Sequence, residues 1–70
     1  MQYLLVSFVE RRGVVVDDIA EGVTNELLEL EEGTHTVTLE GAHDFTPEKR
    51  EIILRRTSEL NPRVACFEKK

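Results

Sequence analysis

Hydrophobic and polar residues alternate along most of this chain, and short apolar runs are separated by turn-forming residues. Four glycines and two prolines fall at intervals, and the runs between them are rich in Val, Leu, Ile, Thr and Phe. Regular turn signals between short β-prone runs are typical of an all-β domain. The pattern therefore predicts strands throughout, with little room for a long helix.

Six segments have the alternation or the apolar content of strands. Residues 2–9 are apolar on both faces, as in a strand at the centre of a sheet. Residues 14–16 are three consecutive valines, whose branched side chains favour a pleated strand. Residues 19–25 fit either a single helical turn or a loop. The six expected strands are approximately 2–9, 13–17, 26–31, 34–40, 50–57 and 63–68.

The segment 26–40 has the pattern of a β-hairpin. Leucine alternates with glutamate before Glu32-Gly33, and Val37 and Leu39 alternate with threonine after it. A glycine between two such segments supplies the positive φ that a tight turn needs. We expect paired strands on either side of the bend, with the threonine face wet and the valine and leucine face dry.

The segment that follows Thr46 fits either a helix or a strand. Thr46-Pro47 with an acid after it is a helix-start signal. The apolar cluster at 52–54, however, would wrap around a helix, and Arg56 stands where a helical apolar stripe would continue. We therefore favour a small six-stranded antiparallel β-sandwich. The alternative is an α+β fold with a C-terminal helix at about 47–58.

Length and charge narrow the class of protein. The 70 residues suffice for one small core, so we expect a single domain over 1–70. Fourteen acids against nine bases give a net charge of −5, which argues against binding to nucleic acid or an anionic membrane. The chain has no apolar run of about 18 residues, so we expect no membrane insertion. With no leader pattern and one cysteine, we expect a cytoplasmic protein if the chain is complete, and we assign no compartment to a fragment.

The order of several short motifs resembles the PEGA domain, over roughly residues 4–57. The stretches that carry the resemblance are 7–10 (SFVE), 14–17 (VVVD), 22–24 (GVT), 28–30 (LEL) and 33–39 (GTHTVTL). The chain is a divergent relative, because only Glu10 of the naming tetrapeptide is present, and Asp18 and Asn25 stand where the family has glycine and often proline. The resemblance implies a small β-sandwich, no established catalytic residues, and binding of polysaccharide or protein.

A few side chains are candidates for chemistry. His35, His43, Asp44 and Cys66 would form a metal site if they converged, and Cys66 would be a nucleophile if a histidine served as its base. Nothing in their spacing requires this. The simpler interpretation places His35 beside the core, His43 in a solvated loop and Cys66 in the core as a small hydrophobe. We assign no catalytic, metal-ligating or cofactor-binding residue.

Charged groups offer two further candidates. Asp17, Asp18 and Glu21 lack the ligand spacing of a calcium loop and are better interpreted as a solvated turn. Two groups of arginines would receive an acidic partner if they converged: Arg11 and Arg12, and Arg50, Arg55 and Arg56.

The sequence thus favours a non-enzymatic interaction module that binds protein or polysaccharide. A homodimer formed by pairing of strand edges is a variant of the same hypothesis. The alternative is a metal-dependent or thiol enzyme that uses His35, His43 and Cys66.

Overall fold

The computed structural model describes all 70 residues and shows an all-β fold with nine strands and no helix. The strands are β1 (Gln2–Ser7), β2 (Gly13–Val16), β3 (Ile19–Val23), β4 (Leu27–Leu30), β5 (Gly33–Leu39), β6 (Phe45–Thr46), β7 (Arg50–Leu54), β8 (Arg63–Cys66) and β9 (Glu68–Lys69). The all-β prediction is confirmed, although the six expected strands become nine. The fold contains no helix capable of spanning a membrane.

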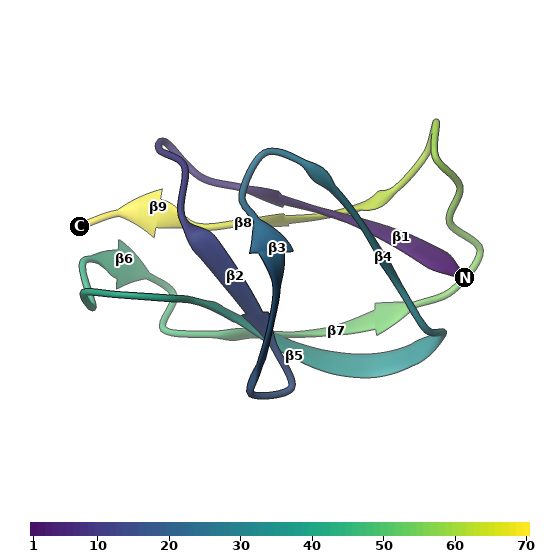
Figure 1. Ribbon diagram of the computed structural model, residues 1–70, viewed down its shortest axis with the longest axis horizontal. Helices are drawn as coiled ribbons and strands as arrows, with labels where there is room; N and C mark the ends of the chain where they lie inside the picture. Colours follow the sequence, from purple (N-terminus) through teal and green to yellow (C-terminus); the bar gives the residue numbers. More distant parts are fainter.

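The first sheet has three strands in the order β4-β1-β8. The central strand β1 is antiparallel to β4, with Leu4 opposite Leu28, and parallel to β8, with Val6 opposite Ala65. Because β1 is flanked by a strand on each side, its outward-facing Tyr3 and Leu5 are half-buried. The parallel pairing corrects the expectation of a purely antiparallel fold, and it arises because residues 55–62 return the chain to the end where β1 begins (Figure 1).

The second sheet has four antiparallel strands in the order β3-β2-β5-β7, and a short third sheet pairs β6 with β9. Val16 of β2 lies opposite Val37 of β5, and His35 of β5 lies opposite Ile52 of β7. In the third sheet Phe45 lies opposite Lys69. The third sheet therefore holds the C-terminal end of the chain against the loop that leads to β7.

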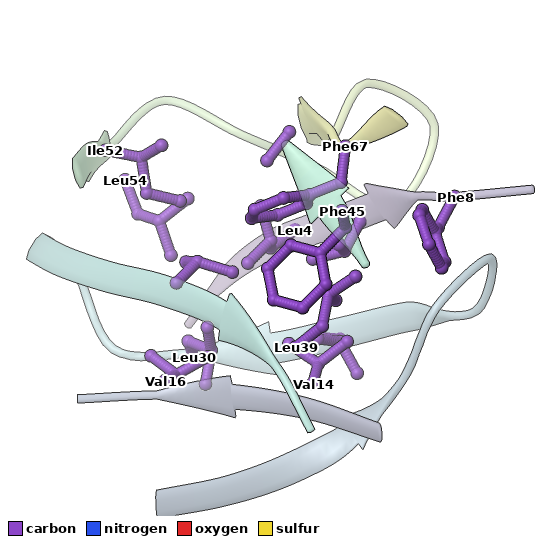
Figure 2. Packing of buried hydrophobic residues seen from close by; sticks show 14 residues of the cluster. Leu4, Phe8, Val14, Val16, Leu30, Leu39, Phe45, Ile52, Leu54 and Phe67 are labelled. Atoms are coloured by element: carbon purple, nitrogen blue, oxygen red, sulfur yellow. The ribbon is translucent and has the colours of Figure 1, made fainter. Parts of the chain in front are cut away.

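One hydrophobic core lies between the two larger sheets (Figure 2). Alternate residues of the strands supply it, because successive side chains of a strand point to opposite faces. Burying one Leu or Val side chain of this kind contributes about 1.5–3 kcal/mol. Phe45 packs edge-to-face against Phe8 and Phe67, with ring centroids 6.3 and 5.7 Å apart. The core residues are Leu4, Val6, Phe8, Val14, Val16, Leu28, Leu30, Val37, Leu39, Phe45, Ile52, Leu54, Ala65 and Phe67.

The predicted hairpin over residues 26–40 is wrong. β4 and β5 belong to different sheets, and Gly33 lies opposite Leu54 of β7 instead of pairing across its own turn. The expected faces are nevertheless present, because Val37 and Leu39 are buried whereas the threonines of β5 are partly or fully exposed. Alternation shows which side chains face the core. It does not say whether the next strand lies beside the first or across the core from it.

The hairpin that does form joins β2 to β3, over a segment expected to be a loop or a helical turn. Val16 lies opposite Ile19, so Asp17 and Asp18 alone make the turn. Both have positive φ, 51° and 68°, as a two-residue type I′ turn requires. Aspartate tolerates this conformation better than most residues do, which is why the sequence can form it without glycine.

The strand predicted after Pro47 is confirmed, and the alternative helix at 47–58 is wrong. β7 runs from Arg50 to Leu54, buries Ile52 and Leu54, and leaves Ile53 53% exposed. The apolar cluster therefore divides between two faces with the period of a strand. The last strand behaves likewise, because Ala65 and Phe67 are buried and Val64 and Cys66 are exposed.

Candidate functional site

His35 is held on both sides by acceptors. Its Nδ1 lies 2.6 Å from the Asp17 carboxylate, and its Nε2 lies 2.7 Å from the Glu31 carbonyl oxygen. Two acceptors favour the doubly protonated imidazolium, so the Glu31 carbonyl and then the Asp17 carboxylate raise the pKa of His35 above its usual range. The side chain is only 14% exposed. Both ring nitrogens are occupied, and neither points an unshared electron pair at a ligand.

Asp17 owes its position to the β2–β3 turn. Its N–H donates to the Thr36 carbonyl oxygen (2.8 Å), and its carboxylate accepts from the Thr36 N–H (2.9 Å). The side chain thus extends the β2–β5 pairing by one position. The hydrogen bond from Thr36, followed by the one from His35, lowers the pKa of Asp17. The arrangement ties the turn to β5.

The three residues of the candidate enzyme site do not form a common site. His35 is engaged as described, and His43 stacks on Phe45 with ring centroids 6.2 Å apart. Cys66 is exposed on β8, which corrects its expected burial, because the alternation of β8 turns it outward with Val64. No group of three or more His, Cys, Asp or Glu side chains is arranged to hold a metal ion.

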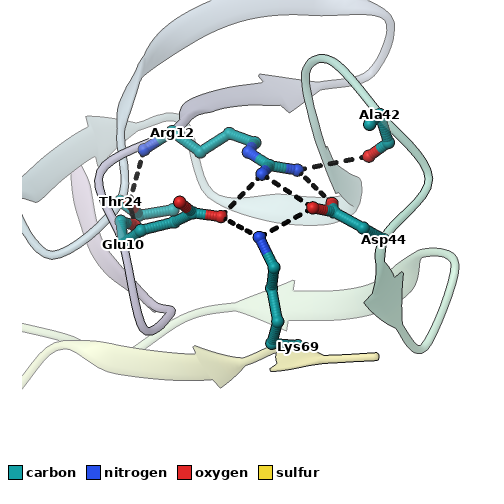
Figure 3. A network of polar contacts seen from close by, with 6 residues as sticks. All are labelled: Glu10, Arg12, Thr24, Ala42, Asp44 and Lys69. Carbon is teal, nitrogen blue, oxygen red and sulfur yellow. Dashed lines mark hydrogen bonds and ion pairs between the residues drawn. The ribbon is translucent and has the colours of Figure 1, made fainter.

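A network of four charged side chains joins distant segments (Figure 3). The Arg12 guanidinium binds Asp44 through two nitrogens, at 2.5 and 3.2 Å, and also binds Glu10 at 2.7 Å. Lys69 contacts both acids and lies 2.7 Å from the Asp44 carboxylate. The network fastens the β1–β2 loop to the loop before β6 and to β9.

Burial and charge make this network cohesive. The Arg12 side chain is 16% exposed, and its guanidinium lies 5.3 Å from the Phe8 ring centroid, with the Lys69 ammonium 6.0 Å from the same ring. Hydrogen bonds from Arg12 and then Lys69 hold the pKa of Asp44 far below its usual range. The acids in turn raise the pKa of Arg12 and of Lys69. The two cations and the two anions of the network pair with one another, so the network leaves no charge free for a ligand and is better explained as a structural link between the loops.

Two residues that follow β3, Thr24 and Asn25, hydrogen-bond to the β1–β2 loop. Thr24 is buried, and its hydroxyl accepts from the Arg12 N–H (2.9 Å) and donates to the Glu10 carbonyl oxygen (2.7 Å). The amide of Asn25 accepts from the Phe8 N–H (3.2 Å) and donates to the Phe8 carbonyl oxygen (2.9 Å). This side chain replaces a strand partner where β1 has ended.

The two arginine groups, which would receive an acidic partner if they converged, do not form one surface. Arg11 is paired with Glu26 at 3.0 Å, and Arg12 belongs to the network. Arg50 donates from Nε to the Cys66 carbonyl oxygen (2.6 Å), whereas Arg55 and Arg56 are exposed and form no ion pair. The basic side chains after Pro47 are therefore a separate group.

The free side of β7 carries unpaired backbone groups. Thr36 bonds to Asp17 through both its N–H and its carbonyl oxygen, so its backbone groups point toward β2. The backbone groups of successive strand residues point to opposite sides, so those of the neighbouring His35 point toward β7. Because His35 lies opposite Ile52, the backbone groups of Ile52 point back toward β5. Those of Glu51 and Ile53 therefore point to the open side.

The free side of β8 faces the same region. The Phe67 N–H donates to the Ser7 carbonyl oxygen (2.9 Å), so alternate residues of β8 are turned to β1. The backbone groups of Val64 and Cys66 consequently point away from β1, and the Cys66 carbonyl oxygen accepts from Arg50 at 2.6 Å. This contact closes one end of the space between β7 and β8.

A surface groove lies between the two open edges. Its lining includes Lys49, Arg50, Glu51, Arg63, Val64 and Ala65. Strand alternation in residues 50–57 and 63–68 was the only signal for it, and the sequence could not say that these strands would end their sheets. We refer to this feature as the β7–β8 groove.

Comparisons with protein-family models, curated proteins and solved structures returned no match.

Proposed function

We propose that this chain is a non-enzymatic binding module that recognises an extended segment of another protein by adding it as a strand. The observation that carries the proposal is that β7 and β8 both end their sheets and turn unpaired backbone groups toward one groove. Unpaired N–H and C=O groups at a sheet edge are a template for pairing with another chain.

The aromatic side chains favour a protein ligand over a polysaccharide. Phe8, Phe45 and Phe67 are buried, and the chain has no tryptophan. Tyr3 is partly buried, and its hydroxyl group lies 3.5 Å from the Glu59 carboxylate. No set of exposed rings is left on which a sugar would stack, whereas strand addition requires only backbone groups.

The enzyme alternative has less support. It needs His35, His43 and Cys66 to act together, but both ring nitrogens of His35 are engaged and no hydrogen bond joins the Cys66 thiol to either histidine. The kinship with PEGA domains stays a prediction, and the proposal does not depend on it.

The proposal predicts binding with the period of a strand. Short peptides are selected on the immobilised protein from a random library of unbiased charge, and one tight binder is synthesised with a single backbone N-methyl group at each position in turn. Because only alternate residues of an added strand hydrogen-bond to the edge, methylation should abolish binding at alternate positions and leave the intervening positions unaffected.

The Kd of each peptide, measured by fluorescence anisotropy, gives the pattern. The unmethylated peptide and a side-chain scramble are the controls. Failure to select any peptide, or a loss of affinity without period two, contradicts the proposed function.

A further inference from the structure

The positive charges of this acidic protein are concentrated in residues 49–63, and Lys49, Arg50 and Arg63 of this segment line the β7–β8 groove. Residues 49–63 contain five basic and two acidic residues, a net charge of +3 in a chain whose total is −5. The five are Lys49, Arg50, Arg55, Arg56 and Arg63. None takes part in an ion pair, whereas Arg11, Arg12 and Lys69 elsewhere are all paired with acids.

The other two open edges have the opposite charge. β4 carries Glu29 and is flanked by Glu26 and Glu31, and β3, which directly follows the Asp17-Asp18 turn, carries Glu21. Acidic side chains along an edge repel an acidic strand that approaches it. Charge therefore distinguishes one groove from the remaining edges of the same fold.

Exposed apolar side chains flank the groove as well. Ile53 on β7 is 53% exposed and Val64 on β8 is 49% exposed. Both come from positions that alternate with core residues, so each lies on the outer face of its sheet next to an open edge. If a strand is added at the free edge of β7, every second side chain of that strand lies beside Ile53 or Val64, and the intervening side chains lie beside the basic residues.

We propose that the β7–β8 groove binds an acidic extended segment of a partner protein, which pairs with the free edge of β7 beside Glu51 and Ile53. Acidic side chains of the segment lie near Lys49, Arg55 and Arg63, and apolar side chains in alternate positions cover Ile53. The inference rests on the proposed function and adds the edge that is used and the charge of the partner.

A pair of synthetic peptides tests the charge. One alternates Glu with Val, and its matched control alternates Lys with Val at the same length. The acidic peptide should bind at least about tenfold more tightly at low salt and lose that advantage as salt is raised, because the attraction is between exposed charges. Amide chemical shifts of ¹⁵N-labelled protein should change at Glu51 and Ile53.

Variants locate the site. Reversing two charges that line the groove together, Lys49→Glu with Arg63→Glu, should weaken the acidic peptide by about tenfold or more, whereas Lys70→Glu, which changes an exposed cation outside the groove, should have a smaller effect. Ile53→Pro should block the edge, because it removes an N–H that points away from β5. Thermal unfolding of each variant confirms that it is folded, and the charge reversal decides the test if Ile53→Pro unfolds the protein.

Several outcomes overturn the inference. They are equal affinity for the two peptides, chemical-shift changes at β3 or β4 in place of β7, an unaltered Kd in the charge-reversed variant, and a dimer of the free protein in sedimentation together with slow amide exchange at Glu51 and Ile53. In each of these cases strand-like binding of a selected peptide would still support the proposed function. Selection of no peptide of any charge would instead contradict both.

Discussion

At the scale of single residues, side chains of this protein replace backbone partners where strands end. The Asp17 carboxylate takes the Thr36 N–H, and the Asn25 amide pairs with both backbone groups of Phe8. Buried or half-buried backbone groups are costly when unpaired, so these side chains stabilise the ends of β1 and β2. His35 joins this group because it binds Asp17 on one side and the Glu31 carbonyl oxygen on the other.

His35 should make stability depend on pH near neutrality. Its pKa is raised above the ordinary 6.5, so its contribution is complete below that pH and is lost as pH rises through the folded-state pKa. The pKa of Asp17 is lowered from 3.8, so its contribution is complete above that pH and is lost as pH falls through the folded-state pKa. The pair therefore stabilises the fold most between about pH 4 and 6.5.

The measurement is the free energy of unfolding in urea across this range and up to about pH 9, together with the NMR titration of both histidine rings. His35→Gln should remove much of the loss of stability above pH 6.5, and His43→Gln is the matched control, which should not. A His35 ring that titrates below its ordinary pKa would refute the interpretation.

Cys66 shows how far residue-level prediction extends. An isolated cysteine inside an apolar run is ordinarily buried, yet this one is exposed because Ala65 and Phe67 on either side of it take the inward positions. The run contains four apolar residues in succession, so alternation alone does not fix which pair points inward. The parallel pairing of β8 with β1 decides it.

At the scale of elements, most of the strands were predictable, although β3 and β6 were not, and the pairing of the strands was not predictable. β4 and β5 have the alternation of a hairpin and a glycine between them, but they lie in different sheets. The true hairpin, β2 with β3, turns through two aspartates, a weaker turn signal than glycine. Gly22 in β3 has φ +134°, and a Cβ there would lie 2.5 Å from Leu28, so this glycine allows the close approach of β4.

The charged network of Glu10, Arg12, Asp44 and Lys69 was equally invisible to sequence reasoning. Its members are separated by up to 59 positions, and each looks like an ordinary surface charge. Only the folding of two loops and β9 around Phe8 brings them together. The sequence hints at the network only through Phe8, an aromatic residue close to Arg11 and Arg12.

Arg12→Lys should lower the thermal unfolding midpoint by a few degrees, because lysine keeps the charge but loses the two-nitrogen bond to Asp44 and the contact of the guanidinium with the Phe8 ring. Arg11→Lys is the matched control. Its ion pair with Glu26 is largely exposed, at 74% and 57%, and should matter little. The comparison is made by calorimetry at low and high salt, and equal midpoints for the two variants would show that the network is incidental.

At the scale of the whole molecule, two sheets share one core but do not close around it. The fold class followed from alternation, and so did the burial of Val37 and Leu39. The open groove did not, because it depends on which strands end each sheet, and that is settled by contacts far apart in sequence such as β1 with β8 and β5 with β7. Strand addition requires that the free edges of β7 and β8 stay unpaired in the free protein.

Amide hydrogen exchange of the free protein, followed by NMR residue by residue, tests this directly. We expect fast exchange at Glu51, Ile53 and Val64, whose N–H groups face the groove, and slow exchange at Ile52 and Leu54, whose N–H groups face β5. Uniformly slow exchange across β7 and β8 would mean that the edges are already covered, and would contradict the open groove and the strand-addition function that depends on it.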